Sequence, residues 1–374
     1  MPSIVNPAIE RNGASTVTQG LFKALAQPPL QARIDCIPVR EKPMRWQRLG
    51  QARSLFRAGV SQLPAKAAFC YSRALRNEIT TRLAREHYDL VMLNGSDILW
   101  LLDYLPPSIP RILVAHNIEY QLFDSQIRSL GWMPPPLPWL LRRDYRRLRE
   151  FEVKGLGDSL NVIFLSHADA AHAGVICPGL NAVCVPPLFD HKPWNRPGTN
   201  TTGVLEISFL GNFGWWPNQA ALRWFVDQVL PHVRTPVRLH LYGQGSERSC
   251  PDNARIVKHG MVESIEQVWK NCDLSICPTL SEAGVHVKLA EAVYNRIPIL
   301  AATQAVRGIA LQEDPAIVLL DGCRSWIDFL NSTAVRDLAS RRVSEKVASV
   351  FSVDTHKDAL QSFVATRLLA GAAA

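Results

Sequence analysis

The chain has 374 residues, 47% of them hydrophobic and 20% charged, which excludes a disordered or fibrous protein. Its length predicts two domains rather than one core. The formal charge of +8 favours phosphorylated or polyanionic partners, but no nucleic-acid recognition motif is present, so no nucleic-acid partner is expected.

Cysteine usage and the absence of apolar segments bear on the compartment. The eight cysteines form no CxxC pair and no zinc spacing, which indicates a reducing compartment. The first residues show no signal-peptide pattern, and no apolar run reaches the roughly 18 residues that span a bilayer. We therefore expect a cytoplasmic protein, with at most a peripheral contact at the inner membrane face.

Short apolar runs alternate with helix-like stretches along almost the whole chain. They are continuous rather than alternating, which is typical of parallel strands buried on both faces. This order predicts an α/β protein with doubly wound sheets. In chain order the predicted strands are Ile4–Val5, Leu90–Leu93, Ile112–Ala115, Val162–Leu165, Ala182–Val185, Ile207–Leu210, Val237–Tyr242, Ala254–Val257, Leu274–Cys277, Ile297–Ala301 and Ile317–Leu320.

The most regular predicted helix is Asn218–Leu230, flanked by Pro217 and Pro231. One apolar stripe runs along it, formed by Leu222, Phe225, Val226, Val229 and Leu230.

A segment rich in proline, glycine, asparagine and threonine, Pro186–Gly203, separates two Rossmann-like halves. We predict an N-terminal domain over 1–190, a linker over 191–204 and a C-terminal domain over 205–350. A C-terminal helix over 351–374 would pack back on the N-terminal domain. Ligands of such sheets bind beyond the carboxyl ends of the strands, so facing sheets would hold a ligand in a cleft.

Two loops of the first half are candidates for a substrate site. Gly13 and Ser15 lie in an NGAS loop, where backbone N–H groups would approach a substrate; a plain loop with a serine helix cap explains them nearly as well. His116 ends a strand, where catalytic groups of such sheets sit, although a histidine that satisfies local backbone is the alternative.

Aromatic and basic residues gather downstream, which suits an anionic membrane surface. The alternative is an ordinary solvated helix face. The residues are Trp132, Trp139, Arg142, Arg143, Arg146 and Arg147.

In the second half, GNFGWWPN at 211–218 follows a strand, and Gly211 and Gly214 would let backbone approach a ligand. Trp215 and Trp216 would pack on a nucleotide or sugar face, or simply in a domain interface. GQG at 243–245 lacks the third glycine of a dinucleotide fingerprint and is better explained as a turn.

The stretch from Cys277 to Ala301 carries the strongest functional signal. A strand and a loop lead through Gly284 into a helix that bears Lys288 and Glu291. The helix N-terminus and the lysine favour a phosphate, and the glutamate favours a sugar hydroxyl. No DxD-type carboxylate pair follows a strand, so no metal site is expected.

These motifs together resemble group 1 glycosyltransferases (glycosyltransferase family 4, GT-B fold). The matching pieces, in order over roughly 205–311, are SFLGNFGWWPNQAALRWFVDQVLP, LHLYGQG, VKHGMVESIEQVWKNCDLSICP and GVHVKLAEAVYNRIPILAATQAVRGI. The NGAS loop, HNIE and LSHADAA of the first half are similar to their family counterparts.

The resemblance implies two Rossmann-like domains facing across a cleft. It also implies retaining, metal-independent transfer of a sugar from a nucleotide-sugar donor to a hydroxyl acceptor, with no cofactor. His116 and Lys288 would be catalytic, and Gly13 and Ser15 would lie on the acceptor side. Donor-binding residues would be Gly211, Asn212, Glu282, Gly284, Lys288 and Glu291.

Two departures from the family pattern stand out. The first glutamate of its E-x7-E motif is Ala283 here, and Glu282 lies one residue earlier. The family's arginine and lysine after the first C-terminal-domain strand are absent from GNFGWWPNQ, so Lys288, with Arg223 or Arg307, would have to neutralise the leaving group.

The expected function is therefore glycosyl transfer to a saccharide or lipid-linked acceptor in cell-surface polysaccharide or glycoconjugate synthesis. Two alternatives stay open: a catalytically silent nucleotide-sugar-binding protein, and a sugar-nucleotide epimerase of the same fold. A nicotinamide oxidoreductase is disfavoured by the incomplete fingerprint.

Overall fold

The computed structural model describes residues 1–39, 62–128, 130–159, 161–194, 203–280, 284–309 and 311–372. The chain divides into two compact units. The first runs from Met1 to Leu188, and Gly284, Val285 and the chain from His356 onward group with it. The second covers the remainder between Phe189 and Thr355. Residues 195–202 of the predicted linker lie outside the described ranges.

The first unit contains a six-stranded parallel sheet in the order β2-β1-β3-β4-β5-β6. The strands are β1 (Pro2–Ser3), β2 (Ile37–Pro38), β3 (Val91–Asn94), β4 (Arg111–Ala115), β5 (Asn161–Phe164) and β6 (Asn181–Cys184). The strand predicted at Ile4–Val5 lies two residues earlier in the structure, where Pro2 and Ser3 pair with β2. Strand β2 was not predicted; it is a two-residue edge strand that tolerates a proline.

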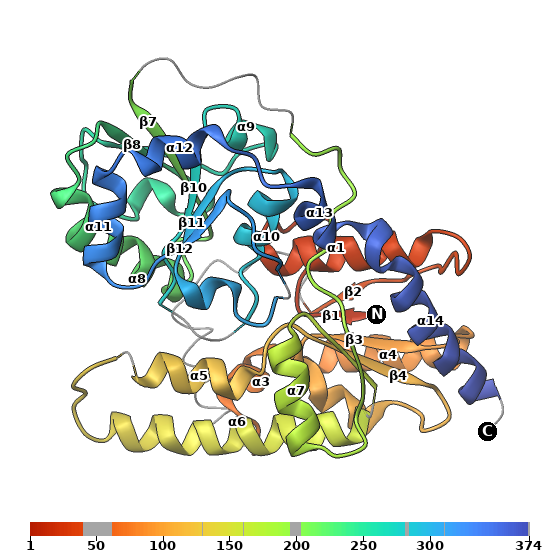
Figure 1. The fold of residues 1–374 in the computed structure, drawn as a ribbon. Coiled ribbons are helices and arrows are strands. Elements are labelled where there is room, and N and C mark those ends of the chain that lie inside the picture. The colour runs from red at the N-terminus through yellow and green to blue at the C-terminus, as the bar shows by residue number, and fades with distance from the viewer. Residues whose placement is uncertain are drawn as a thin grey trace. The chain divides into compact units, whose positions relative to one another are not determined.

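Helices flank this sheet, and α5 and α6 lie side by side (Figure 1). The helices are α1 (Gly13–Ala26), α3 (Ala65–Cys70), α4 (Arg73–Arg85), the 3-10 helix η1 (Ser96–Tyr104), α5 (Glu119–Arg128), α6 (Leu137–Ser159), α7 (His167–Ile176) and α14 (Val353–Ala372). The expected serine cap of α1 is wrong. Helix α1 begins at Gly13, and Asn12 caps it by accepting the Ser15 N–H at 2.9 Å.

The second unit also contains a six-stranded parallel sheet, in the order β12-β11-β10-β7-β8-β9. The strands are β7 (Leu205–Leu210), β8 (Val237–Tyr242), β9 (Ile256–Gly260), β10 (Leu274–Cys277), β11 (Ile299–Ala301) and β12 (Ile317–Leu319). Ile207, Phe209, Leu239 and Leu241 alternate along β7 and β8 and are buried in the core on one face of this sheet.

The helices of the second unit are α8 (Trp216–Trp224), α9 (Glu266–Trp269), α10 (Val287–Tyr294), α11 (Cys323–Asn331), α12 (Ala334–Ser340) and α13 (Glu345–Ala348). Shorter turns are η2 (Phe225–Val229), η3 (Leu230–His232), η4 (Ser246–Arg248), η5 (Thr303–Val306) and η6 (Ser349–Phe351).

The helix predicted over Asn218–Leu230 begins at Trp216 and changes to a π-helical turn at Phe225. Its apolar stripe packs in or against the core, as predicted.

Each unit is thus a parallel sheet with flanking helices, which confirms the predicted α/β class with two Rossmann-like units. None of the helices in the described ranges combines the length and apolarity that crossing a bilayer requires.

Candidate functional site

The carboxyl ends of β7 and β8 bring two glycine-containing loops into backbone contact. The Gly211 N–H donates to the Tyr242 carbonyl at 2.9 Å. A Cβ atom at Gly243, whose φ is +119°, would lie 2.1 Å from the Gly211 carbonyl oxygen. Gly243 is therefore required by both its conformation and this close approach.

The Gly211–Gly214 loop is closed by its own asparagine. The Asn212 side-chain oxygen accepts the Gly214 N–H at 2.9 Å. The Asn212 carbonyl accepts a hydrogen bond from the Asn218 side-chain nitrogen at 2.9 Å. Asn212 thus shapes the loop, and Trp215 and Trp216, which follow it, are partly exposed.

Lys288 reaches this loop from α10. Its Nζ donates to the Asn218 side-chain oxygen at 2.7 Å and lies 4.5 Å from the centre of the Phe209 ring. Burial lowers the pKa of Lys288, while the neighbouring Cys277 thiol acts in the opposite direction. No carboxylate among the described residues forms an ion pair with it. An ammonium with neutral partners at the end of parallel strands suits an anionic ligand.

Glu291 lies one helical turn from Lys288 on α10 and is buried. Its Oε1 accepts hydrogen bonds from His191 Nε2 at 3.1 Å and from Asn295 Nδ2 at 3.3 Å. Burial opposes charge on His191, but the contact with Glu291, the Lys192 carbonyl and the charge of Asp190 together raise the His191 pKa. Oε2 has no hydrogen-bond partner within the described ranges.

The remaining predicted donor residues are Gly284 and Glu282. Gly284 adopts φ +79°, the left-handed conformation that glycine tolerates, just before α10. Glu282 lies outside the described residues.

In the first unit, His116 follows the carboxyl end of β4 and is buried. Its Nε2 lies 2.8 Å from the Asn94 side-chain oxygen. The Asn94 nitrogen donates to the hydroxyls of Ser3 and Thr18, both at 2.8 Å. Burial lowers the His116 pKa to about 4, although the charge of Glu119 opposes this. The imidazole is therefore neutral near pH 7.

A glutamate on α6 caps α5, which starts three residues after His116. The two oxygens of Glu152 accept the backbone N–H groups of Glu119 and Tyr120, each at 3.0 Å. Burial raises the Glu152 pKa to about 8, and the charge of Glu119 contributes to the rise. Glu119 in turn is paired with Lys66. The predicted sites did not include Glu152 or Asn94, because isolated polar residues give no periodic signal.

The acceptor-side loop has a structural explanation in the first unit. The Ser15 hydroxyl donates to the Glu10 carbonyl at 2.6 Å, and the residue is buried. Gly13 is the first residue of α1. The Ser15 hydroxyl is thus engaged within the protein, whereas Gly13 lies at the helix start, where N–H groups are exposed by geometry.

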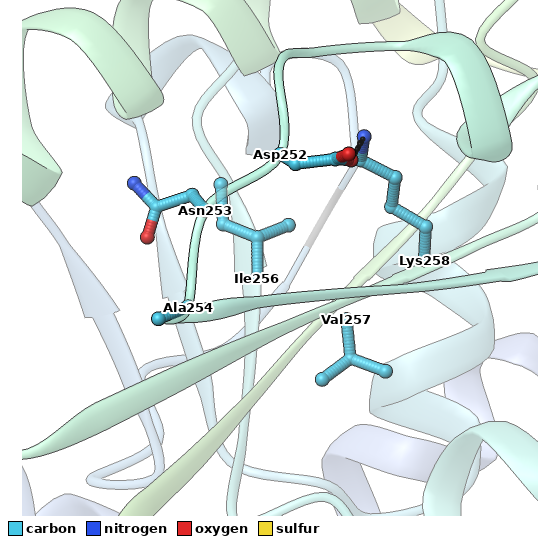
Figure 2. A pocket seen from close by; sticks show the side chains of 6 residues that line it. All are labelled: Asp252, Asn253, Ala254, Ile256, Val257 and Lys258. Carbon is cyan, nitrogen blue, oxygen red and sulfur yellow. Dashed lines mark hydrogen bonds and ion pairs between the residues drawn. The ribbon is translucent and has the colours of Figure 1, made fainter.

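A shallow hollow lies at the amino-terminal end of β9, away from the strand ends described above (Figure 2). Its one ammonium, Lys258, is neutralised by Asp252 at 2.8 Å and bonded to the Cys250 carbonyl at 2.6 Å. The hollow is lined by Asp252, Asn253, Ala254, Ile256, Val257 and Lys258. It brings together none of the predicted site residues.

Within the described ranges, no three histidine, cysteine, aspartate or glutamate side chains are gathered as metal ligands. The polar groups at the strand ends are instead an ammonium, a carboxylate and backbone amides.

Comparison with known proteins matches part of the second unit to a family. Residues 205–323 match the family model described as glycosyl transferases group 1. No curated protein matches the chain.

Solved structures share the fold at low sequence identity. Sucrose-phosphate synthase from Thermosynechococcus elongatus has a TM-score of 0.67 at 14% identity, over 99% of this chain and 100% of that one. HepE from Anabaena, in complex with UDP-glucose, has a TM-score of 0.60 at 15% identity, over 96% and 97%.

A point mutant of TarM from S. aureus, in complex with fondaparinux, α-GlcNAc-glycerol and UDP, has a TM-score of 0.58 at 12% identity. That match covers 79% of this chain and 59% of TarM, so the chain spans about three fifths of that protein. Residues 205–323 of the second unit therefore match the group 1 glycosyltransferase family, in a chain with the two-sheet GT-B fold.

Proposed function

We propose that the chain is a glycosyltransferase that moves a sugar from a nucleotide-sugar donor to a hydroxyl acceptor. The observation that carries the proposal is the ammonium of Lys288. It lies beside the Gly211–Gly214 loop at the carboxyl ends of the strands, with neutral partners only among the described residues. The donor would bind to the second unit and the acceptor to the first.

The chemistry sets what the site must supply. The bond from the anomeric carbon to the diphosphate breaks, and negative charge develops on the diphosphate oxygen. Preorganised positive charge at that position is the largest contribution that a protein makes to such a step. Lys288 and the N-terminal turn of α10 would provide it, which is the basis for proposing metal-independent transfer. Retention of configuration rests on the family resemblance.

His116 and Glu291 would have positioning roles. The fixed amide of Asn94 leaves the proton of His116 on Nε2, so Nδ1 would accept a hydrogen bond from a sugar hydroxyl. Oε2 of Glu291 would accept from the donor ribose, while Oε1 is held by His191.

The test begins with a thermal-shift screen of nucleotide sugars and nucleoside diphosphates. A ligand at a hundred times its Kd stabilises the folded state by about 2.7 kcal/mol. UDP is the first probe, because HepE and TarM have been solved with UDP bound.

With the donor identified, Lys288→Ala should lower transfer at saturating donor about a hundredfold. Lys270→Ala, at an exposed lysine of the same unit, is the control and should retain wild-type turnover. Near-normal turnover of Lys288→Ala would contradict the catalytic role.

A catalytically silent nucleotide-sugar-binding protein is the second candidate, favoured by Ala283 in place of the family's first glutamate. Binding without transfer or donor hydrolysis, over a panel of acceptors, would support it. A sugar-nucleotide epimerase would instead convert the donor to its stereoisomer, which chromatography of the nucleotide sugar detects.

The partner of the first unit would be an anionic membrane surface that carries a lipid-linked saccharide. Trp132 and Trp139 are 87% and 58% exposed, and the Arg143 guanidinium lies 5.7 Å from the Trp139 ring centre. Arg142 and Arg146 are exposed on the same helix, α6. Exposed indoles beside arginines suit the headgroup region of an anionic bilayer. The protein would then act at the cytoplasmic face, in polysaccharide or glycoconjugate synthesis.

A further inference from the structure

The loop that follows β7 contains no basic residue, yet an ammonium is held against it. GNFGWWPN carries no lysine, arginine or histidine. Lys288 belongs to α10, 70 residues after Asn218, and the two side chains meet at 2.7 Å. The positive charge beside this loop therefore comes from α10, and Asn218 accepts the hydrogen bond that holds it there.

The amide of Asn218 has only one orientation that satisfies its neighbours. Its nitrogen donates to the Asn212 carbonyl at 2.9 Å, and its oxygen accepts from Lys288. Reversing the amide would set N–H₂ against the ammonium and oxygen against the carbonyl. The residue is 7% exposed, and its side-chain nitrogen would lie 3.0 Å from a Cβ at Gly211. It is fixed in place by packing as well as by hydrogen bonds.

The Asn218 side chain that holds Lys288 is neutral, so it does not cancel the charge that the ammonium would present to a ligand. A carboxylate at the same position would cancel the ammonium, whereas an amide oxygen holds it and leaves the net charge intact. An ammonium has three donors, and Asn218 uses one. The Phe209 ring face, 4.5 Å away, supports the cation without supplying an opposing charge.

We propose that Asn218, in the first turn of α8, is a positioning residue. It orients the Lys288 ammonium toward the diphosphate of a donor bound beside the Gly211–Gly214 loop. Lys288 thereby replaces the basic residues that this loop lacks. The inference rests on the proposed function and adds the residue that orients Lys288 toward the donor.

The experiment compares UDP with uridine, which differ only in the diphosphate. Asn218→Asp keeps the shape of the side chain and adds a negative charge beside Lys288. We expect its affinity for UDP to fall about tenfold or more, and its affinity for uridine to stay within about twofold. Asn253→Asp makes the same charge change at an exposed loop position of the same unit and should leave both affinities unchanged.

Measuring UDP affinity over a range of pH separates a role of Asn218 in orienting Lys288 from a role in supporting the loop. Cys277 of β10 is the titratable group that acts on Lys288 among the described residues, and burial lowers the lysine's pKa. Wild-type affinity for UDP should fall as the pH rises and Lys288 loses its proton. In Asn218→Asp the added carboxylate stabilises the ammonium, so this fall moves to higher pH. A purely structural role would weaken UDP and uridine alike and leave the midpoint unmoved.

Two further variants keep the proposal testable. In a Lys288→Met background, the neutral change Asn218→Ser should no longer alter the preference for UDP over uridine. If Asn218→Asp does not fold, Asn218→Ser retains a neutral but shorter acceptor and should lose about tenfold in UDP affinity relative to uridine.

The outcomes separate the two hypotheses. Wild-type protein that binds no nucleoside diphosphate in the panel would overturn the proposed function. Wild-type protein that binds UDP, with a folded Asn218 variant of unchanged affinity and pH midpoint, would overturn this inference alone. If another base is preferred, its diphosphate and nucleoside replace UDP and uridine.

Discussion

The side-chain oxygen of Asn94, at the end of β3, accepts the Nε2 proton of His116 at 2.8 Å. The amide cannot be reversed without loss, because the Thr18 hydroxyl donates its single proton to the Ala14 carbonyl at 2.8 Å and can only accept from Asn94. The assignment of the proton to Nε2 follows from this network. A neutral imidazole of fixed tautomer is thus built into the strand ends of the first unit.

His116 should make stability depend on pH below neutrality. Burial lowers its folded pKa to about 4, from an ordinary value of 6.5. Between these values the unfolded chain binds a proton that the folded one does not, so this contribution is complete above pH 6.5 and is lost as the pH falls. The lowered pKa corresponds to about 3 kcal/mol.

Urea unfolding of wild type and His116→Gln at pH 7 and pH 4 measures this directly. The difference between their free energies of unfolding should shrink by about 3 kcal/mol at the lower pH. His87→Gln removes an exposed imidazole and should follow the wild-type curve. A constant difference between wild type and His116→Gln would show that burial does not control the proton.

Glu152 should be among the most sensitive positions of the first unit. It caps α5 through the N–H groups of Glu119 and Tyr120. Glu152→Ala leaves two buried donors unsatisfied and should lower the free energy of unfolding by about 2–4 kcal/mol. Glu150→Ala, at an exposed neighbour on α6, should cost at most about 0.5 kcal/mol. Chemical denaturation at pH 7 compares them, and equal losses would contradict the capping role.

Glu152 also has a pH signature of opposite sign to that of His116. Its folded pKa, about 8, lies above its ordinary value of 4.5, so its contribution falls as the pH rises between these values. Glu152→Gln, which cannot titrate, should therefore gain stability relative to wild type from about pH 5 to about pH 8.

The sequence predicts the sheets better than the polar contacts between elements. The runs Val237–Tyr242 and Leu274–Cys277 coincide with β8 and β10. Strand β10 is buried along its whole length, as a strand covered on both faces must be, whereas β8 alternates its apolar residues with Arg238 and His240. Asn94 and Glu152 are single polar residues whose partners lie 22 to 91 residues away, and Asn218 meets Lys288 across 70 residues. Only the fold brings such pairs together, so neither spacing nor composition reveals them.

Lys288 and Glu291 should differ in which part of the donor they affect. If Lys288 contacts the diphosphate and Glu291 the ribose, Lys288→Met should weaken both UDP and inorganic pyrophosphate, by about tenfold or more. Glu291→Gln keeps the shape and the contact with Asn295 but removes the charge. It should weaken UDP to a similar extent and leave pyrophosphate within about twofold.

Isothermal titration calorimetry of the two variants with both ligands gives four affinities. Glu266→Gln, at an exposed glutamate of α9, is the control for the loss of a negative charge in the second unit. A parallel loss of pyrophosphate binding in Glu291→Gln would contradict a separate ribose contact.

The exposed aromatic and basic residues of the first unit predict binding to anionic bilayers. Trp139, Arg142 and Arg146 follow one another at helical spacing on α6. Sedimentation with vesicles that contain phosphatidylglycerol should pellet the protein, whereas pure phosphatidylcholine vesicles should not. Binding should weaken as salt rises from about 0.05 to about 0.5 M, because salt screens the attraction between the arginines and the anionic headgroups.

Charge reversal and aromatic removal separate the two contributions to vesicle binding. Arg142→Glu with Arg146→Glu should lower vesicle affinity by more than about tenfold, since each basic residue contributes about 1 kcal/mol near such a surface. Trp132→Ser with Trp139→Ser should weaken binding even at low salt, because the indoles enter the headgroup region.

Matched variants of the second unit define the background for this comparison. Arg324→Glu with Arg336→Glu reverses two exposed charges, and Trp215→Ser removes a partly exposed indole. If these variants reduce vesicle binding as much as those at Trp132, Trp139, Arg142 and Arg146, attraction is due to overall charge and hydrophobicity, and the first unit has no dedicated membrane surface.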